Sequence, residues 1–525
     1  MRERRERRDG SERHPIDLTD KQILGPEHNR DVQLKDGTFM RVARISEVDD
    51  ETWMIGRRLW IQNHLGLMMP EAGTQNELVW VSFCDNDANE SDREVRVRAA
   101  EIHRFCKIVF TNVPHAYLNI TQVRDAQDDL FFCRWQRMTT TERTAKGNQN
   151  MAGSIVPIDV ADTDVTTIEL WDGGSQNARV APAELRRHFR GPSGCKPGGS
   201  SGSRRSAKYT FADFFCGAGG VSQGAVDAGL ALRLALDANG DAIRTYHHNF
   251  NRPGLDIQSD DISNFINKHP AARGGLPIDI VHASPPCQPF SRANTTPNAA
   301  NDAENLATFT TVRDIIEICK PRIMTLEEAD GLTDDRHREW LQRLFSWFIE
   351  FGYSVQWRVV EMWRYGVPQR RRRLILIAAG PGETLPPFPA FTHGTDAGLL
   401  PPPTIAQAIE DIDDDVDDRL NDVSAVHHFP VPKPTLPRNG VSGTLTCNGG
   451  GGKVYHFDGL RKHTVRELLS LQTFPASFDF PGNVQGNLTS MRKQIGNAVP
   501  PAFSRALFAT VVDWLKGEDA RELFA

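Results

Sequence analysis

One cysteine in the middle of the chain stands on a segment that is unusually stiff for a reactive side chain. The segment reads ASPPCQPFS, residues 283–291, and follows the apolar run 278–281. Pro285 and Pro286 fix their φ angles and remove two backbone donors, so the turn that carries Cys287 has little freedom. A thiolate is the attacking form of cysteine, and nearby positive charge favours it. Two interpretations stay open, a nucleophile and a buried structural thiol.

A carboxylate and a basic run follow the thiol along the chain. Glu327 ends the apolar run of RIMTLEEADGL, and Glu328 comes directly after it. Successive residues of a strand face opposite sides, so these two carboxylates should diverge. The segment GVPQRRRRLILIA places Gln369, Arg371 and Arg373 on alternate positions just before a strand, where they share a face suited to phosphate or carboxylate contacts. A surface acid pair and a solvated basic run are the alternatives.

A glycine-rich loop earlier in the chain offers a place for a ligand. It reads DFFCGAGGVSQG, residues 213–224. The dinucleotide fingerprint G-x-G-x-x-G fails because Ser222 stands where the third glycine belongs. Gly217 and Gly219 let the backbone approach a ligand closely. A ligand without phosphate, such as S-adenosylmethionine, therefore suits the loop, although a structural glycine turn remains an alternative.

Two acids follow at intervals that fit the rest of such a ligand. Asp237 ends a strand-like run, where a carboxylate can accept bonds from both ribose hydroxyls. Asp261 with Ile262 could hold an adenine amine and pack on its ring. Surface carboxylates or helix caps are the alternatives for either acid.

These residues each follow a strand-like run in the second half of the chain. The runs alternate with helical stretches and cover residues 209–215, 232–237, 278–283, 323–327, 355–360 and 374–378. The rhythm predicts an α/β fold with a doubly wound, Rossmann-like parallel sheet. Ligands bind at the carboxyl ends of the strands in such sheets, so the chemistry should gather at one edge.

The chain is long enough for two or three domains, at 525 residues. We expect a charged disordered tail over 1–30, a β-rich module over 31–190, a Gly/Ser linker over 191–208 and the α/β domain over 209–525. No cysteine pair has the spacing C-x-x-C, so we expect no metal site. No apolar run is long enough to span a bilayer and the N-terminus has no apolar signal region, so we expect residence inside the cell.

In this order, the residues resemble the cytosine-C5 DNA methyltransferases. The similar blocks lie within 209–515 and read FFCGAGG, SPPCQPFS, LEEA, QRRRR, TVRELLSLQTFP and QIGNAVPP. Within the family, the phrases NDAENLATF, KPRIMTLEEADGL and LPPFPAFTHG are most similar to the fungal RIP-defective (RID) group, which is linked to premeiotic silencing of repeats. In that group the N-terminal module resembles a BAH-like domain.

The resemblance implies a role for each residue. Cys287 would attack C6 of a cytosine flipped out of the duplex, Glu327 would hydrogen-bond N3 and Arg371 would contact O2. Carbon C5 would take the methyl group of S-adenosylmethionine, which leaves S-adenosylhomocysteine. The residues implied at the cofactor are Phe215, Gly217, Gly219, Asp237, Asp261, Ile262, Asn497 and Val499.

One position departs from the family. The usual sequence Glu-Asn-Val is Glu327-Glu328-Ala329 here. In the family the Asn braces the catalytic loop, and a carboxylate cannot donate a hydrogen bond as an amide does. If Glu328 lies near Glu327, repulsion between like charges favours a protonated acid. Catalysis that is slow or conditional is therefore one expectation.

The resemblance places target recognition at about residues 384–462. The net charge of −7 requires any positive patch to be local. The basic residues of this region cluster in its second half, whereas its first half contains the acidic run 410–422. The segment 441–453, VSGTLTCNGGGGK, contains a Thr-Leu-Thr signature of the family. The residues expected to contact DNA are Gln288, Ser291, Arg373, Thr444, Thr446, Lys453, Arg461 and Lys462.

The sequence thus predicts a DNA (cytosine-5)-methyltransferase that acts on double-stranded DNA in the nucleus, in repeat silencing. Its N-terminal module is expected to meet chromatin or a protein partner, and no membrane is expected. The main alternative is a DNA- or chromatin-binding homologue with weak catalysis, suggested by Glu328 and by the module. A tRNA C5 methyltransferase ranks last, because those enzymes lack a comparable N-terminal domain.

Overall fold

The structure is a computed structural model of the chain. It describes residues 31–61, 77–83, 94–112, 130–143, 149–158, 167–169, 175–177, 179–191, 209–270, 275–291, 299–410, 412, 418–447 and 454–524. The chain divides into two compact units. The first comprises residues 1–65, 73–138 and 158–179, and the second comprises 66–72, 139–157 and 180–525.

The first unit is built from strands that close into a ring. Its strands are β1 (Asp31–Leu34), β2 (Phe39–Val48), β3 (Glu51–Ile61), β4 (Glu77–Phe83), β5 (Val95–Arg98), β6 (Ile102–Phe110) and the start of β7 (Leu130–Arg143), with a separate pair β9 (Thr167–Glu169) and β10 (Ser175–Asn177). Neighbours follow the order β7-β4-β3-β2-β1-β6, and β6 pairs with β7 to close the ring. Phe39, Leu59 and Phe110 are fully buried in its core. The prediction that this part is β-rich is confirmed.

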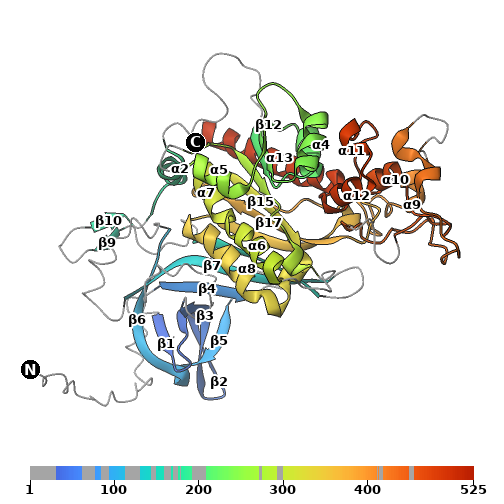
Figure 1. Ribbon diagram of the computed structural model, residues 1–525. Helices are drawn as coiled ribbons and strands as arrows, with labels where there is room; N and C mark the ends of the chain where they lie inside the picture. The colour runs from blue at the N-terminus through green and yellow to red at the C-terminus, as the bar shows by residue number, and fades with distance from the viewer. Residues whose placement is uncertain are drawn as a thin grey trace, which may run out of the picture. The chain divides into compact units, whose positions relative to one another are not determined.

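The second unit is a mixed sheet flanked by helices (Figure 1). Its strands, in spatial order, are β13 (Asp256–Ser259), β12 (Ala231–Asp237), β11 (Thr210–Phe214), β14 (Ile280–Ala283), β15 (Ile323–Ala329), β17 (Arg372–Ala379), β16 (Ser354–Glu361) and β8 (Gln149–Pro157). The strands from β13 to β15 pair in parallel, whereas β17 is antiparallel to both of its neighbours. The α/β prediction is confirmed, but the sheet is not wholly parallel. The connection from β16 to β17 is short, and a short connection requires an antiparallel pair.

The helices of the second unit are α2 (Pro182–Arg190), α3 (Gly220–Asp227), α4 (Gly240–Phe250), α5 (Ile262–Lys268), α6 (Ala299–Thr310), α7 (Val312–Cys319), α8 (Arg338–Glu350), α9 (Ile405–Ile409), α10 (Val465–Leu471), α11 (Gly482–Gln485), α12 (Leu488–Asn497) and α13 (Pro501–Phe524). Helices flank this sheet, while α9 to α12 lie to one side of it and pack mainly against one another (Figure 1). Helix α7 packs against α5 and α8, and α13 packs against α3. In α7 the buried residues Val312, Ile315, Ile316 and Cys319 recur at the spacing of one helical face, and Ile318 beside them is buried as well. Asn239 caps α4, and Thr464 and Glu467 form a capping box on α10.

Short 3-10 turns connect several of these elements. They are η3 (Ala99–Glu101) in the first unit and η7 (Gln288–Phe290), η8 (Asp330–Thr333), η9 (Asp335–His337), η10 (Met362–Tyr365), η11 (Arg419–Asn421) and η12 (Val423–Ala425) in the second. The turn η7 matters most for the site, because it begins directly after Cys287.

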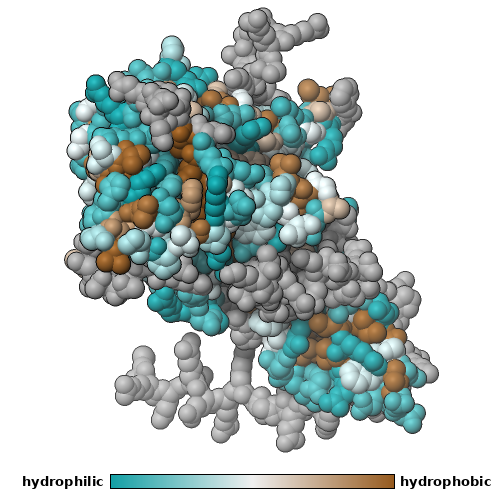
Figure 2. All heavy atoms as spheres, turned by 90° about the vertical axis from the view of Figure 1, so that its right-hand side faces the viewer, coloured by the Kyte–Doolittle hydropathy of each residue, from teal (hydrophilic) through white to brown (hydrophobic). Residues whose placement is uncertain are grey.

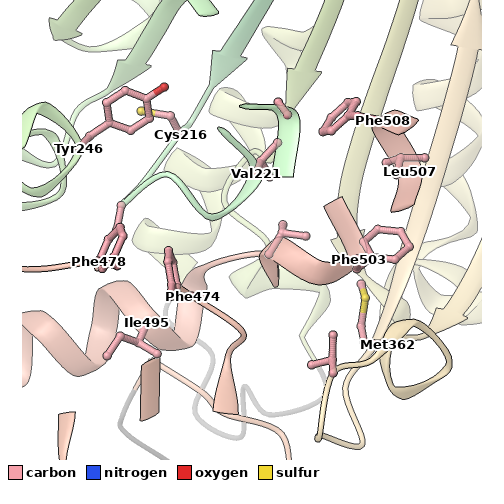
Figure 3. Close-up of a cluster of buried hydrophobic side chains, with 14 of the residues drawn as sticks. Cys216, Val221, Tyr246, Met362, Phe474, Phe478, Ile495, Phe503, Leu507 and Phe508 are labelled. Atoms are coloured by element: carbon pink, nitrogen blue, oxygen red, sulfur yellow. The ribbon is translucent and has the colours of Figure 1, made fainter. Parts of the chain in front are cut away.

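The largest core cluster of the second unit joins segments that are far apart in the sequence (Figure 3). Cys216 and Val221 come from the glycine-rich loop and the helix behind it, and Phe508 comes from α13. The rings of Phe211 and Phe508 lie 4.9 Å apart, edge to face. The C-terminal helix is therefore part of the core that supports the glycine-rich loop.

Strand β8 and helix α2, both N-terminal to residue 191, belong to the second unit. Strand β8 pairs with the edge strand β16, with Ile155 opposite Val355. Helix α2 reaches the sheet through Arg186, which donates to the carbonyl oxygen of Gly382 at 2.6 Å, and through Phe189, whose ring lies 5.5 Å from that of Tyr353. The predicted module 31–190 therefore extends beyond the first compact unit, because β8 and α2 both contact the rest of the second unit. The predicted tail, and the predicted linker beyond residue 191, lie outside the described residues.

Hydrophobic residues on the face shown in Figure 2 lie in groups between hydrophilic ones. The large hydrophobic side chains exposed among the described residues are Ile45, Val48, Leu400, Val431, Leu460, Leu488 and Leu523. None of the helices in the described ranges combines the length and the apolar character needed to cross a membrane.

Candidate active site

The thiol lies at the carboxyl end of β14, as predicted. Cys287 directly precedes η7, and the backbone N–H of Phe290 donates to its carbonyl oxygen at 3.1 Å. Ser284, at the start of the loop, donates its N–H to Phe214 of the neighbouring strand at 3.3 Å. At the other end, the fully buried ring of Phe290 lies 5.2 Å from that of Phe309. The loop is therefore anchored on both sides of a partly exposed cysteine.

The two carboxyl groups at the end of β15 point to opposite faces of the strand, as predicted. Glu327 pairs with Ile375 of β17 and so shares a face with Arg373, whose Nε lies 2.8 Å from its Oε1. Glu328 pairs with Leu374 and has no exposed surface. Its Oε2 accepts the N–H of Ala329 at 3.0 Å, whereas its Oε1 is buried without a hydrogen-bond partner.

Arg371 is fully enclosed just before β17. Its Nη1 donates to the carbonyl oxygens of Leu445 and Gly496, at 3.1 and 3.0 Å. Its Nη2 lies 3.9 Å from Oε1 of Glu327. Burial, and then the charge of Arg373, lower the pKa of Arg371 to about 9. Arg371 thus connects Glu327 of β15 to Leu445 and to Gly496 near the end of α12.

The surroundings of the thiol disfavour its charged form. Burial raises the pKa of Cys287 to about 12, and among the charged groups Glu328 raises it most. Arg373 and Arg371 oppose that shift. Burial, and then the charge of Glu327, also raise the pKa of Glu328 well above its usual value. A reactive thiolate therefore requires that the positive charges outweigh the carboxylates when a substrate is bound.

The glycine-rich loop turns through backbone conformations that favour glycine. Gly217 and Gly219 have φ of +53° and +93°, and Phe215 shares this region at +60°. A Cβ on Gly219 would lie 2.2 Å from Cε2 of Phe250. The N–H of Gly217 donates to Oδ2 of Asp237 at 2.8 Å, which ties the loop to the end of β12. A Cβ on Gly217 would meet nothing within 4 Å, so open space lies beside the loop.

The other predicted cofactor residues gather around the same strand ends. The N–H of Asp260 donates to the carbonyl oxygen of Asp237 at 3.2 Å, so the ends of β12 and β13 are adjacent. Asp261 is exposed and caps α5 by accepting the N–H of Ser263, while Ile262 is buried. Val499 is buried, and its carbonyl oxygen would lie 2.3 Å from a Cβ on Gly220.

Asn497 stands exposed at the end of α12. The structure therefore brings the first and last sequence blocks together, because Gly220 in the loop and Val499 just after α12 lie in close approach.

A buried network behind this loop was not predicted. The hydroxyl of Ser222 donates to Oδ2 of Asp213 at 2.6 Å and lies 2.7 Å from the hydroxyl of Tyr246. Burial raises the pKa of Asp213 to about 7, and the charge of Asp237 adds to the shift. Ser222 is the residue that breaks the glycine pattern in the sequence. In the structure it connects the glycine-rich loop to Asp213 and Tyr246. The sequence signal was an acid inside an otherwise apolar strand.

Gln369 is a second buried support. Its side-chain amide donates to the carbonyl oxygen of Leu471 at 2.8 Å, and its Oε1 accepts the N–H of Leu445 at 3.0 Å. Thr444 donates its hydroxyl to the carbonyl oxygen of Arg370 at 3.1 Å. The carbonyl oxygen of Thr446 would lie 2.2 Å from a Cβ on Gly496. The Thr-Leu-Thr segment is thus fixed beside the arginine run and α12.

The basic residues predicted to contact DNA differ in whether a carboxylate of the protein already binds them. Arg461 forms two contacts with Glu467, at 2.8 and 2.7 Å. Although burial raises it, hydrogen bonds from Arg461 and His463 hold the pKa of Glu467 far below its usual value. Lys462 is half-buried, and Arg373 is held by Glu327.

The remaining predicted DNA contacts lie beside the thiol or outside the described ranges. Gln288 is exposed and Ser291 is half-buried, directly after Cys287, whereas Lys453 lies outside the described residues. No cluster of three or more His, Cys, Asp or Glu residues suited to a metal occurs within the part of the chain that the structure describes.

Known proteins are similar to this chain over the part that carries the site. The profile of the family described as C-5 cytosine-specific DNA methylase matches residues 209–429 and 420–513. The type II methyltransferase M.XorII of Xanthomonas oryzae pv. oryzae is 30% identical over 387 residues, covering 60% of this chain and 87% of that protein. M.NgoFVII of Neisseria gonorrhoeae, also a type II methyltransferase, is 28% identical over 327 residues, covering 56% of this chain and 84% of its own. Among solved structures, the S. pombe Dnmt2 methyltransferase aligns with a TM-score of 0.42 at 16% identity, covering 59% of this chain and 99% of that chain.

Proposed function

The chain belongs to the C-5 cytosine-specific DNA methylase family, and from this premise we propose that Cys287 carries out the reaction through a covalent bond to the base. Members of the family transfer a methyl group from S-adenosyl-L-methionine to C5 of cytosine in DNA, and this chain is a DNA (cytosine-5)-methyltransferase. The single observation that carries the proposal is the position of Cys287, partly exposed on an anchored loop at the carboxyl end of β14.

The residues around the glycine-rich loop fit the cofactor. The space beside Gly217, the hydrogen bond from its N–H to Asp237 and the adjacent ends of β12 and β13 make a cradle with acidic groups at one side. Phe215, Asp237, Asp261 and Ile262 would hold the nucleoside part, and Asn497 and Val499 would close the site. The bound cofactor supplies a methyl group on a positively charged sulfur, which C5 of the base can attack.

Cys287 attacks C6 of a cytosine that has left the base stack. The new S–C6 bond uses the thiolate electron pair, and the electrons of the C5–C6 double bond move toward N3 and make C5 nucleophilic. After C5 has taken the methyl group, a base removes the C5 proton. The electron pair of that C–H bond re-forms the double bond and expels the thiolate, so 5-methylcytosine is released and Cys287 is restored.

Glu327 and its arginines stabilise the base during this sequence. Glu327 hydrogen-bonds N3, which neutralises the charge that develops in the ring. Arg373 orients Glu327 through their 2.8 Å contact. Arg371 contacts O2 of the cytosine, and its own position is fixed by the carbonyl oxygens of Leu445 and Gly496.

We infer that double-stranded DNA is the substrate and that it lies along the half of the target recognition region after residue 430. Thr444 and Thr446 come close to Arg370 and Gly496, and therefore to the catalytic arginines. Gln288 and Ser291 flank the thiol on the same loop. Lys462 supplies positive charge at the other end of the region.

The biological setting is also proposed from the sequence. The phrases similar to the fungal RID group support a role in repeat silencing in the nucleus. The β-rich first unit supports a BAH-like module for chromatin or a protein partner. A DNA-binding homologue with weak catalysis is the second candidate, and the observation that favours it is the buried Glu328 next to Glu327, where the family has Asn.

Trapping with 5-fluorocytosine tests the mechanism. Fluorine at C5 blocks the elimination step, so duplex DNA carrying this base should form a stable adduct with the full chain in the presence of the cofactor. Peptide mapping should place the adduct on Cys287, and Cys287→Ala should form none while still binding the duplex. An adduct in the Ala variant would show another nucleophile. Tight binding without an adduct or methyl transfer in the unchanged protein would favour the second candidate.

A further inference from the structure

Glu328 is an acid in a place that disfavours its charged form. Its side chain has no exposed surface, and Oε1 has no hydrogen-bond partner. On β17 the residue opposite it is Leu374, which is apolar, while Arg371 and Arg373 occupy the alternate face with Glu327. Oε2 accepts the N–H of Ala329, but burying an ionised carboxylate whose Oε1 lacks a partner is costly, so the neutral acid is the stable form here. A neutral acid, unlike a carboxylate, has a proton to donate.

The loop of Cys287 is a neighbour of the strand that carries Glu328. Strand β15 packs against η7, which begins directly after Cys287. Among the charged groups that shift the pKa of Cys287, Glu328 has the largest effect, followed by Arg373, Glu327 and Arg371. The charged groups that act on Glu328 in turn are Glu327 on its own strand and Arg373 from β17. The thiol and the acid therefore compete to ionise, because each negative charge disfavours the other.

We propose that Glu328 is a positioning residue that works as a neutral acid: it donates a hydrogen bond to the loop of Cys287 and, by staying uncharged, allows the thiol to ionise. This inference rests on the proposed role of Cys287 as nucleophile. An amide at this position donates at every pH, whereas an acid donates only while it keeps its proton. The substitution of Asn by Glu therefore gives this enzyme an alkaline limit that an amide would remove.

Three variants of the full chain separate the parts of the proposal. Glu328→Gln keeps the shape and the donor but cannot ionise, Glu328→Asn restores the family residue, and Glu328→Ala removes the donor. Glu339→Gln, at an exposed position on α8, is the matched control. Methyl transfer to duplex DNA should be measured from mildly acidic to alkaline pH at saturating cofactor.

At neutral pH, Glu328→Gln should keep kcat within about twofold of the unchanged protein, whereas Glu328→Ala should lose roughly tenfold, the effect of about one hydrogen bond. At alkaline pH the unchanged protein should lose activity while the Gln and Asn variants keep it. Equal loss in the Gln and Ala variants, or the same pH profile with and without Glu328, would overturn the proposal.

Alkylation of Cys287 gives a second readout that does not depend on turnover. The rate of reaction with iodoacetamide, followed by mass spectrometry of the Cys287 peptide, should rise at lower pH in Glu328→Gln than in the unchanged protein. Cys319, which is fully buried, is the internal reference. An unchanged pH dependence of alkylation would contradict the electrostatic part.

The two proposals fail in different ways. If 5-fluorocytosine DNA forms no adduct on Cys287 of the unchanged protein, the mechanism itself is wrong. If that adduct forms and the Glu328 variants do not behave as stated, the inference about Glu328 alone is wrong.

Discussion

Arg373 Nε lies 2.8 Å from Oε1 of Glu327, and both side chains lie on the same face of the paired strands β15 and β17. The carboxyl group that is proposed to meet the base is thereby held in a fixed orientation before any substrate binds. Arg371, on the same face, is fixed independently by two carbonyl oxygens. The site is thus organised around one carboxyl group and two guanidinium groups, with the thiol on the adjacent loop.

We expect Glu327→Gln to reduce kcat by about 10²- to 10⁴-fold, the usual contribution of a positioned general acid. The amide cannot transfer a proton to N3, although it keeps the shape of the side chain. The KM for the cofactor should change little, because Glu327 lies on the base side of the site. Steady-state methyl transfer checks both values, with Glu339→Gln as control, and an unchanged kcat would remove Glu327 from the mechanism.

Asp237→Asn should weaken cofactor binding by roughly 10- to 100-fold, as expected for loss of a charged hydrogen-bond acceptor. The carboxylate also accepts the N–H of Gly217, so the loop should loosen as well. Calorimetric titration with S-adenosylhomocysteine measures the effect. Asp227→Asn, an exposed acid on α3, is the control and should bind normally. Equal affinity of both variants would place the nucleoside elsewhere.

The stability of the protein should fall with rising pH because of Asp213, whose pKa is about 7 in the fold against an ordinary value of 3.8. Between these values the unfolded chain has lost the proton that the folded chain keeps, so the free energy of unfolding decreases by up to about 1.4 kcal/mol per pH unit. Asp213→Asn lacks this term. Urea unfolding at several pH values should show that the free energy of unfolding of the variant rises relative to that of the unchanged protein as the pH increases from 3.8 to about 7. Above this range the difference should stay constant. A constant difference within the range as well would contradict the buried acid.

Lys462→Ala should weaken binding to all duplex sequences and reduce the slope of log affinity against log salt by about 0.9, the value for one phosphate contact. Fluorescence anisotropy at several salt concentrations measures the slope. Lys516→Ala, on α13 and outside the target recognition region, is the matched control. An unaltered slope would move the phosphate path away from Lys462.

Ile155→Ala should destabilise the second unit by about 2–5 kcal/mol, the cost of a truncated core side chain. Ile155 is 1% exposed on β8 and lies opposite Val355 on β16. Ile45→Ala, at a position 37% exposed on β2, removes the same atoms at the surface and should cost much less. Denaturant unfolding compares the two, and equal effects would mean that β8 adds nothing to the sheet.

Local patterns were enough to predict the core strands and the edge where the chemistry lies. Strands β11, β12, β14 and β15 are apolar runs, and the residue types that follow them indicate that this edge of the sheet binds a ligand. The direction of β17 could not be read from such a pattern, because it depends on the short connection after β16. Strand β13 is short and half-exposed, and β8 lies far from its partner in sequence, so neither gave a signal.

The candidate site residues stay predictions, but their surroundings show where sequence reasoning stops. The Arg461–Glu467 pair and the Asp213–Ser222–Tyr246 network depend on which side chains meet in space. A basic residue in a favourable stretch looks free in the sequence, whereas Arg461 is engaged by a carboxylate. The opposite directions of Glu327 and Glu328 were predictable, because they follow from the alternation of a strand.

The close approach of Gly220 to Val499, and of Gly224 to Ser504, has a consequence for biosynthesis. The ribosome completes β11 and α3 long before it makes the segment that lines their other side. A nascent chain therefore cannot finish its cofactor cradle until Ser504 has emerged, and a transcript truncated shortly before that codon should yield a product that never captures the methyl donor.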